Sequence, residues 1–296
     1  MKRTLIIGAA FVDVLMDVPK LPTTGEDVSG KLRGNIVGGS AFNVYGAVKY
    51  AQQSADLFVP VGEGQYADVV RAKMARCKIP VMLSVSGADN GWDISFVEPS
   101  GERSFLTVNG IEQLWQSDWF ETIDIGDYDY FYVSGYEMED ERAADVILSA
   151  LAKRKLETEV VFDASPRIQY ISRKTIERLL SEGVMIHCNQ SEIDQLVAGS
   201  GKLSEKCAQL YDKTRAPVIV TLGDQGAYVF AGPDEGKVPP TQRKVVNTLG
   251  AGDTFCGGLI GGLAAGLTIS DAVGKGNELA SLVVGQESGT LLDRLS

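Results

Sequence analysis

Short apolar runs alternate with amphipathic stretches along most of the chain. Strands of a parallel sheet covered on both faces are apolar throughout, and helices between them show apolar residues three or four positions apart. The apolar runs predict strands at residues 4–9, 57–61, 81–85, 130–134, 160–163, 184–188 and 218–222. The other stretches predict helices near residues 44–51, 64–76, 139–154, 171–182, 191–198, 204–214 and 259–267. This alternation predicts an α/β fold, a three-layer α/β/α sandwich around a doubly wound, mostly parallel sheet.

Two segments depart from this alternation. Residues 14–34 carry scattered valines and leucines that are broken by prolines and glycines, which predicts short strands and turns. Residues 92–97 and 103–108 flank a Pro-Ser-Gly-Glu turn and predict a β-hairpin. No repeat, low-complexity stretch or linker separates these segments from the rest, so we expect residues 1–296 to form a single domain.

The composition excludes several classes of protein. Hydrophobic residues make up 44% of the chain and charged residues 23%, and no apolar run approaches the roughly 20 residues of a membrane span. The net charge of −11 argues against nucleic acid or an acidic membrane surface as a partner. The four cysteines show no CxxC spacing, which predicts reduced thiols in a cytoplasmic protein. The one histidine, His187, lies in an apolar run and is expected in the core.

A glycine-rich turn near the C-terminus carries the strongest chemical signal. Residues 245–249 lead into Gly250, Ala251, Gly252 and Asp253, and an apolar helical stretch follows. A strand, a tight glycine turn and a helix start would aim backbone N–H groups and the positive end of a helix dipole at one point, which suits an anion. A carboxylate beside a phosphate would repel it. Asp253 therefore suits the task of taking a proton from a hydroxyl group during phosphoryl transfer.

These motifs carry a resemblance to a known family. Residues 249–255, Leu-Gly-Ala-Gly-Asp-Thr-Phe, resemble the C-terminal signature of the ribokinase-like (PfkB) carbohydrate kinases. Residues 38–43, Gly-Gly-Ser-Ala-Phe-Asn, are similar to the N-terminal signature of that family, and residues 189–192 to its Asn-x-x-Glu motif. The resemblance covers nearly the whole chain and implies a ribokinase-like fold and the use of ATP.

The resemblance also implies which residues hold the substrate. Substrate contacts fall on Asp13, Gly38, Gly39, Asn43 and Glu137, and Arg103 of the hairpin is a further candidate. Each of three candidates has a structural alternative. Asp13 could be an acid in a solvated turn, Glu137 an acid at the start of a helix, and Arg103 a solvated arginine on a strand. Ser40, expected to cap the following helix, stands where ribokinase carries a lysine. About residues 13–35 and 91–109 should form a small β-sheet lid over the site, through which two chains form a homodimer.

The nucleotide side of the site follows from the same resemblance. It places ATP against Asn189, Thr221, Gly223, Gly226 and Asn277. Glu192 would hold Mg²⁺ through its water shell, because Mg²⁺ keeps several waters and needs few carboxylates. Asn247 stands where potassium-activated members carry an acid that takes part in a monovalent-cation site. An amide oxygen can bind K⁺ but adds no charge.

We therefore expect an ATP-dependent kinase for a hydroxymethyl group of a sugar or sugar-like alcohol. Asp253 would be the general base, and the N–H groups of Gly250, Ala251 and Gly252 would form the anion hole. A nucleoside kinase of the pseudouridine or adenosine type shares every motif and is the first alternative. A sugar- or nucleotide-sensing protein without turnover is the second. A dinucleotide oxidoreductase lacks its GxGxxG fingerprint after the first strand.

Overall fold

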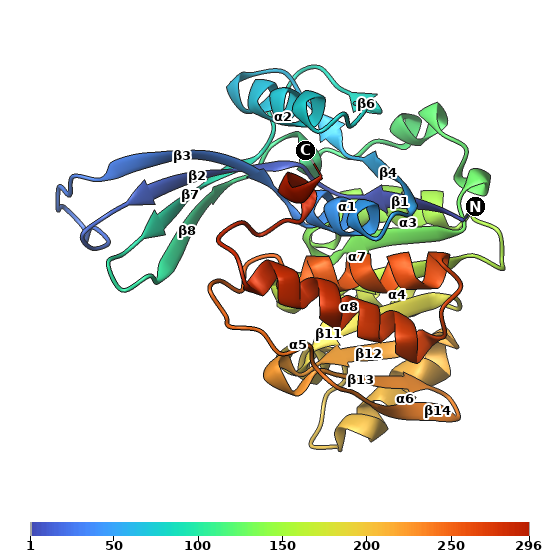
Figure 1. Cartoon of the computed structure of the whole chain (residues 1–296). Coiled ribbons are helices and arrows are strands. Elements are labelled where there is room, and N and C mark those ends of the chain that lie inside the picture. The colour runs from blue at the N-terminus through green and yellow to red at the C-terminus, as the bar shows by residue number, and fades with distance from the viewer. Residues whose placement is uncertain (1, 296) are drawn as a thin grey trace.

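The main sheet forms the centre of the molecule. The computed structural model describes residues 2–295, and across these residues eight strands lie in the order β14-β13-β12-β11-β10-β9-β1-β4 (Figure 1). The strands from β4 to β12 are parallel: β4 (Ser54–Phe58), β1 (Arg3–Ile7), β9 (Tyr130–Ser134), β10 (Glu159–Asp163), β11 (Val184–Asn189) and β12 (Val218–Thr221). The strands β13 (Ala227–Ala231) and β14 (Asp234–Val238) continue the sheet antiparallel. The predicted mostly parallel sheet is confirmed.

Helices cover both faces of this sheet (Figure 1). One face packs against α1 (Ser40–Tyr50), α2 (Gln65–Arg76), α7 (Ala251–Ala264) and α8 (Ile269–Val284). The other face packs against α3 (Glu141–Leu151), α4 (Arg173–Leu179), α5 (Gln190–Leu196) and α6 (Leu203–Thr214). Successive strand residues alternate between the two cores, so Ile6 of β1 joins the first core, and Leu5 and Ile7 join the second. The chain thus forms the predicted three-layer sandwich.

A second, smaller sheet projects from the sandwich. In the described chain it has four strands in the order β3 (Lys31–Gly38), β2 (Phe11–Asp17), β7 (Trp92–Val97) and β8 (Arg103–Val108) (Figure 1). The pair β2–β7 is parallel, and β7 and β8 form the predicted hairpin. The strands come from the two segments that were expected to depart from the α/β alternation. The predicted smaller sheet is confirmed, and its role as a lid stays a prediction.

Two expected strands are absent from the main sheet of the described chain. Residues 81–85 contribute only β6 (Leu83–Ser84), which pairs with β5 (Pro60–Val61), because Leu83 alone of this run is buried. Val245 and Val246 are exposed and lie in a loop, where the N–H of Val246 donates to the carbonyl of Val284 at the end of α8. The glycine turn is therefore entered from a loop and not from a strand.

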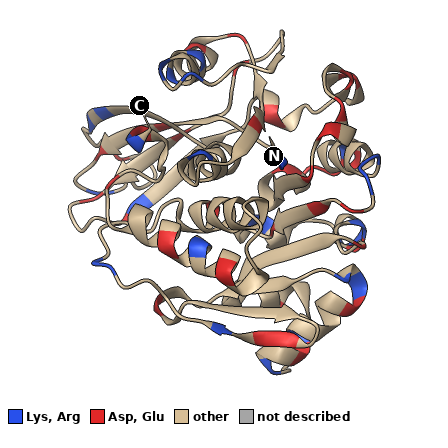
Figure 2. Ribbon diagram, turned by 45° about the vertical axis from the view of Figure 1, so that its right-hand side comes forward, with Lys and Arg blue, Asp and Glu red and all other residues tan. Residues whose placement is uncertain are grey.

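Charged residues are distributed over the outside of the fold. Figure 2 shows Lys and Arg interspersed with Asp and Glu on the outer helices and loops. None of the helices within residues 2–295 has the length and apolar character that crossing a bilayer requires.

Candidate active site

The turn before α7 is shaped by a glycine that no other residue replaces easily. Gly250 is the N-cap of α7 and adopts left-handed dihedral angles, φ 70° and ψ 8°. A Cβ atom at this position would lie 1.9 Å from the carbonyl oxygen of Gly289. The first N–H groups of a helix have no intrahelical acceptor, although that of Ala251 makes a long 3.3 Å bond to the carbonyl of Thr248. The turn therefore presents backbone donors and the positive end of α7 beside Asp253.

Close packing of α7 on α1 brings Asp253 against the N-terminal turn of α1. A Cβ atom on Gly257 would lie 2.6 Å from the carbonyl oxygen of Val44, so only glycine permits this approach. Asn43 Nδ2 donates to Oδ2 of Asp253 at 2.9 Å, and Ser40 Oγ donates to Oδ1 at 2.7 Å. Both oxygens of the proposed base are held in place by residues more than two hundred positions earlier in the chain.

The environment of Asp253 makes the ionised carboxylate harder to form. Burial and the nearby charge of Asp163 raise the pKa of Asp253 above its ordinary value of 3.8. Hydrogen bonds from Asn43 and Ser40 and the proximity of His187 oppose this shift. A carboxyl with a raised pKa is a better proton acceptor than an ordinary aspartate, as general-base catalysis requires.

Ser40 does not cap α1 as the sequence predicted. The N-cap of this helix is Gly39, no side chain caps it, and Ser40 is the first helical residue. The hydroxyl of Ser40 is buried, donates to Asp253, and lies 2.5 Å from the hydroxyl of Tyr132. Ser40, at the position where ribokinase carries a lysine, thus links Asp253 to the buried hydroxyl of Tyr132.

The projecting sheet contributes a pair of carboxyl groups. Asp13 of β2 lies beside Asp93 of β7 in the parallel register, and Asp13 Oδ2 would lie 3.2 Å from a Cβ atom on Gly38. Burial and the adjacent Asp93 raise the pKa of Asp13 to about 8, with Arg103 opposing the shift. Burial raises the pKa of Asp93 to about 6. Asp13, Gly38 and Arg103 therefore lie together, as predicted for substrate contacts.

Two neighbours of Asp13 were not anticipated from the sequence. Oδ1 of Asp93 and Oγ of Ser95 are buried and have no hydrogen-bond partner among the described residues. Buried polar atoms are almost always paired in native proteins, so unpaired ones in a cleft indicate a missing ligand or water. The sequence shows that Asp93 and Ser95 lie on one face of a strand at residues 92–97. It does not show the register with β2 that brings them to Asp13.

A cavity of 1170 Å³ lies against this sheet. Its lining residues include Asp13, Ser95, Arg103 and Phe105 of the projecting sheet and Lys73 of α2. It is also lined by Asn247, Leu249 and Gly289, so it adjoins the Gly250 turn. Asp253, Asn43 and Glu137 are not among its lining residues, and the proposed base therefore lies beyond one end of this cavity.

Glu137 occupies the helix-entry position that was the alternative to a substrate contact. Its Oε2 accepts from Ser134 Oγ at 2.7 Å and from the N–H of Ser134 at 3.3 Å, which forms a capping box for the short helix Gly135–Met138. Burial raises the pKa of Glu137 to about 7, and Asp253 contributes to the increase. Oε2 of Glu137 therefore caps this helix, as the alternative to a substrate contact predicted.

The residues expected on the nucleotide side follow the ends of β11 and β12. Asn189 and Glu192 form the capping box of α5, and Thr221 Oγ1 donates to the carbonyl of Cys188 at 3.4 Å. Asn277 donates to the carbonyls of Val238 and Pro239. Open space surrounds Gly223, whereas Gly226 packs against the backbone of residues 238–240. A ligand can thus approach Gly223 closely. The other residues make contacts within the protein that hold these segments together.

The two expected cation sites differ in how well the residues suit a metal. Oε1 and Oε2 of Glu192 each accept one 2.8 Å hydrogen bond from Asn189, which leaves lone pairs for water-mediated contact with Mg²⁺. In contrast, Asn247 accepts from the N–H of Leu249 and donates to the carbonyl of Glu287. That amide ties two loops together and carries no charge, so it fits a K⁺ site poorly.

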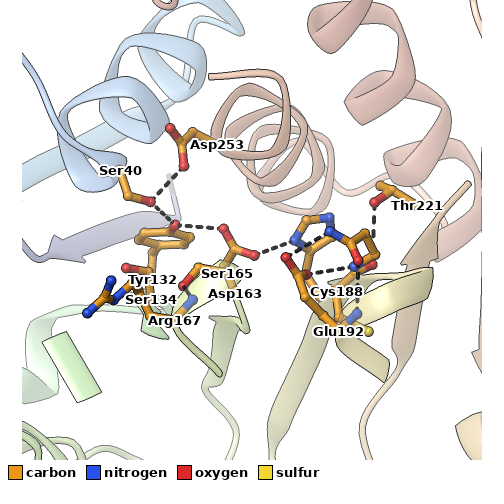
Figure 3. A network of polar contacts seen from close by, with 12 residues as sticks. Ser40, Tyr132, Ser134, Asp163, Ser165, Arg167, Cys188, Glu192, Thr221 and Asp253 are labelled. Atoms are coloured by element: carbon orange, nitrogen blue, oxygen red, sulfur yellow. Dashed lines mark hydrogen bonds and ion pairs between the residues drawn. The ribbon is translucent and has the colours of Figure 1, made fainter. Parts of the chain in front are cut away.

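Below Asp253 the structure reveals polar contacts that the sequence did not predict. Figure 3 shows Asp253, Ser40, Tyr132 and Asp163 linked in a row. Asp163 Oδ1 also lies 2.8 Å from His187 Nδ1. The expected core position of His187 is confirmed. Arg167, four residues after Asp163, does not join this row, and its Nε donates to Glu139 Oε2 at 2.7 Å.

Comparison with known proteins identifies the family of the chain. The family model described as pfkB family carbohydrate kinase matches residues 1–293. The uncharacterized sugar kinase YegV of Escherichia coli K12 is 33% identical over 291 residues, which cover 97% of this chain and 90% of that protein. The ribokinase of Arabidopsis thaliana is 23% identical over 301 residues, which cover 95% of this chain and 75% of that protein.

Solved structures show the same fold. Ribokinase from Thermotoga maritima aligns with a TM-score of 0.83 at 18% identity and covers 99% of this chain and 98% of that chain. Adenosine kinase from Sinorhizobium meliloti aligns with a TM-score of 0.80 at 21% identity and covers 98% of this chain and 95% of that chain. The predicted ribokinase-like fold is confirmed, and at these identities the substrate does not follow from it.

Proposed function

Because the chain belongs to the PfkB family of carbohydrate kinases, we propose that Asp253 is the general base of an ATP-dependent transfer to a hydroxymethyl group of its substrate. One observation carries this assignment. A carboxylate held at both oxygens by Ser40 and Asn43 lies in the first turn of α7, beside the turn of Gly250. The acceptor hydroxyl would give its proton to Asp253 as its oxygen attacks the γ-phosphorus of ATP.

The remaining residues would position the two substrates. The N–H groups of Gly250, Ala251 and Gly252 are proposed to stabilise charge on the transferring phosphoryl group. Asn189, Glu192, Thr221, Gly223 and Asn277 would line the nucleotide side. Mg²⁺, when bound through water to Glu192, would neutralise charge on the phosphates. Closure of the projecting sheet would exclude water from the reacting groups.

A neutral, polyhydroxylated sugar is the substrate class that the projecting sheet favours. Asp13, Asp93 and Ser95 offer carboxyl and hydroxyl groups to sugar hydroxyls. Oδ1 of Asp93 and Oγ of Ser95 have no partner among residues 2–295, although Asp93 also hydrogen-bonds to Asp13. A phosphosugar would need a cluster of free cations, and Arg33 already pairs with Asp17. The proposed pair Asp13–Asp93 would also repel an anionic group.

A nucleoside kinase is the second candidate, and the cavity favours it. A volume of 1170 Å³ exceeds the space that one sugar ring fills, and Phe105, which lines it, is exposed. Two other aromatic side chains, Phe42 and Trp92, are less available to a base. Phe42 is fully buried, and Trp92 stacks on Tyr66 with ring centroids 4.8 Å apart.

ATP consumption across a panel of substrates tests the proposed function. The panel contains free sugars, sugar acids, sugar phosphates and nucleosides, each with Mg²⁺ and with the Asp253→Asn variant as a matched control. We expect turnover with a neutral sugar that disappears in the variant. Turnover with a nucleoside only would select the second candidate, and ATP binding without turnover on any compound would favour a non-catalytic sensor.

The Asp13–Asp93 pair predicts a fall in kcat/KM at alkaline pH. Because the pKa of Asp13 is raised to about 8, the pair keeps one proton at neutral pH and loses it as pH rises through about 8. Two adjacent carboxylates would then face the substrate, and kcat/KM should fall roughly tenfold for each further pH unit. The measurement is kcat/KM for the accepted sugar between pH 6 and about 9.5.

Matched variants identify the groups responsible. Asp93→Asn removes the charge that raises the pKa of Asp13, so the alkaline fall should move out of this range. Ser95→Ala should weaken binding by about tenfold through a lost hydrogen bond but keep the alkaline fall. An Asp93→Asn variant with an unchanged alkaline limb would show that the pair does not titrate in the site.

We further propose that two chains associate through the apolar face of the projecting sheet. Leu32 and Leu106 are 59% and 56% exposed, and Val108 is also exposed on the same face of β8 as Leu106. Leu106→Gln should weaken dimerisation about tenfold or more, measured by sedimentation at several concentrations. Thr107→Gln, on the opposite face of the same strand, is the control. A wild-type chain that is monomeric at every concentration would contradict the proposal.

We also propose that the protein is located in the cytoplasm. All four cysteines are unpaired, and Cys188, Cys207 and Cys256 are buried. Free thiols are typical of reducing compartments.

A further inference from the structure

A row of buried polar groups connects Asp253 with the only histidine of the sequence (Figure 3). Ser40 Oγ lies 2.7 Å from Asp253 Oδ1 and 2.5 Å from the hydroxyl of Tyr132. That hydroxyl lies 3.2 Å from Asp163 Oδ2, and Asp163 Oδ1 lies 2.8 Å from His187 Nδ1. Ser40, Tyr132, Asp163 and His187 are each at least nine-tenths buried. Four such residues in one row need a physical explanation.

The strand register explains why the row lies directly beneath α7. Asp163 of β10 pairs with His187 of β11 in the parallel sheet. Tyr132 pairs with Val161, two residues before Asp163, so Tyr132 and Asp163 face the same way. This face carries the core that includes α7, and the imidazole of His187 stacks on Phe255 with ring centroids 5.0 Å apart. Thus β9, β10 and β11 each contribute one polar residue under the helix that carries Asp253.

The available protons give the row a direction. A carboxylate only accepts, so the single proton of Ser40 goes to Asp253 and Nδ1–H of His187 donates to Asp163. The hydroxyl of Tyr132 has one proton and two neighbouring oxygens, and the Ser40 oxygen is the nearer one. Burial raises the pKa of Tyr132 well above 10, so this proton stays in place during turnover. Ser40 therefore donates to Asp253, and Tyr132, which is the donor in its 3.2 Å hydrogen bond to Asp163 Oδ2, links Ser40 to Asp163.

The charges around Asp253 and His187 come from several elements. Burial lowers the pKa of His187, but the Asp163 carboxylate outweighs it, and the pKa is raised above 6.5. The titratable groups that interact electrostatically with Asp253 or His187 are Asp163, Glu192, Glu137, Tyr132, Tyr136 and Cys256. Asp163, Glu192 and Asp253 each favour the charged form of His187, although its Nε2 is buried without a hydrogen-bond partner among the described residues.

We propose that His187, through Asp163, Tyr132 and Ser40, is a positioning residue for Asp253 that holds the carboxylate in one orientation and keeps it ionised. Ser40 fixes Oδ1 and Asn43 fixes Oδ2, and the positive charge of His187 offsets Asp163, whose charge would otherwise make ionisation of Asp253 harder. His187 does not touch the substrate in this account. The inference rests on the proposed role of Asp253 as the base.

The interaction between two titrating groups is reciprocal. If the charge on His187 favours ionisation of Asp253, then the charge on Asp253 must favour protonation of His187 by the same free energy. Each group therefore reports on the other. Because the sequence contains one histidine, its imidazole gives a single set of NMR signals without any label on a specific site.

The first arm of the test titrates His187 by NMR in the wild type and in Asp253→Asn. We expect a pKa above 6.5 in the wild type, Nδ1 protonated throughout, and a lower pKa in the variant, which has lost a charge that favours protonated His187. This arm needs no substrate and no turnover. It therefore remains informative even if the panel of sugars finds no activity, and it separates failure of this inference from failure of the proposed function.

The second arm compares the acid limb of the kcat profile. Activity is lost as pH falls through the pKa of Asp253. The charge of His187 lowers this pKa, and His187→Gln removes that charge. The acid limb should therefore move to higher pH in the variant. Below the limb, kcat should fall about tenfold for each pH unit of the shift, with KM unchanged. Met185→Leu is the control, because Met185 is buried in the same core and lies two residues before His187.

Either arm can overturn the inference. A His187 that titrates below 6.5 in the wild type, or identically in Asp253→Asn, would contradict the coupling. In a folded His187→Gln, an acid limb equal to that of Met185→Leu would contradict it too. If His187→Gln does not fold, Tyr132→Phe tests the same row, because it keeps both charges and removes the hydroxyl that supports Ser40. We expect that variant to lower kcat and to leave KM unchanged.

Discussion

Asp253→Asn is expected to lower kcat by about 10²–10⁴-fold, the range that a positioned general base contributes. Asn has nearly the same shape but cannot take the proton of the acceptor hydroxyl. Ser40 and Asn43 would retain at least one polar partner in the variant, because the side-chain oxygen still accepts a hydrogen bond. KM for both substrates should change little, since Asp253 acts mainly in the transition state. Steady-state kinetics at saturating ATP and sugar measures the effect.

The control for this variant is its stability and its affinity for ATP. Burial raises the pKa of Asp253, so the neutral Asn removes the cost of burying a charge, and the melting temperature should not fall. A variant with wild-type kcat would show that another group takes the proton. A variant that lost ATP binding together with turnover would place Asp253 in binding and not in proton transfer.

Gly250→Ala is expected to lose most turnover as well, but for a conformational reason. The left-handed φ of 70° is costly for alanine, and the new Cβ atom would meet the carbonyl oxygen of Gly289 at 1.9 Å. Such backbone strain costs about 1–3 kcal/mol. The turn must shift to relieve it, which misaligns the N–H groups at the start of α7. Loss of one well-aligned donor to developing charge reduces kcat by about 10²–10³-fold.

Gly252→Ala provides the matched control on stability. A Cβ atom there would lie 3.9 Å from its nearest neighbour, Cε1 of His187, which is an ordinary contact. We expect the free energy of unfolding of Gly252→Ala to stay within about 0.5 kcal/mol of wild type and that of Gly250→Ala to fall. Chemical denaturation measures both. Equal stabilities would mean that the turn tolerates a side chain at residue 250.

The layered architecture was predictable because it depends on local patterns. Uninterrupted apolar runs such as residues 130–134 and 184–188 belong to strands that are buried on both faces, and these were confirmed. The strand Asp234–Val238 escaped prediction because it is a polar, exposed edge strand that forms only by pairing with β13. The strand predicted at residues 81–85 was wrong. The apolar run after Pro80 suggested a buried strand, but Leu83 alone of these residues is buried.

The site was predictable where one short motif contains it and hidden where it depends on distant segments. The turn with Gly250 and Asp253 could be located in the sequence, and its resemblance to a known family supplied the roles. The contact of Asp253 with Ser40 joins positions 213 residues apart, and the meeting of Asp13 with Asp93 depends on strand register. No local pattern reveals either contact.

The row beneath Asp253 shows the same limit. Asp163 ends one predicted strand, and His187 lies within another, which placed His187 in the core. Their pairing, and the use of Tyr132 and Ser40 to reach Asp253, follow only once the strands are aligned. A lone histidine among apolar residues is usually a core residue, and His187 is one. Its unusual feature is the set of acids around it.

The central claim, phosphoryl transfer from ATP to a hydroxymethyl group, is tested most directly by ³¹P NMR of the product. With the sugar that supports the fastest ATP consumption, we expect a new phosphomonoester signal that is split into a triplet by the two protons of a CH₂ group. The signal should be absent with Asp253→Asn under the same conditions. Inorganic phosphate as the only product, or a doublet from a secondary alcohol, would contradict the account.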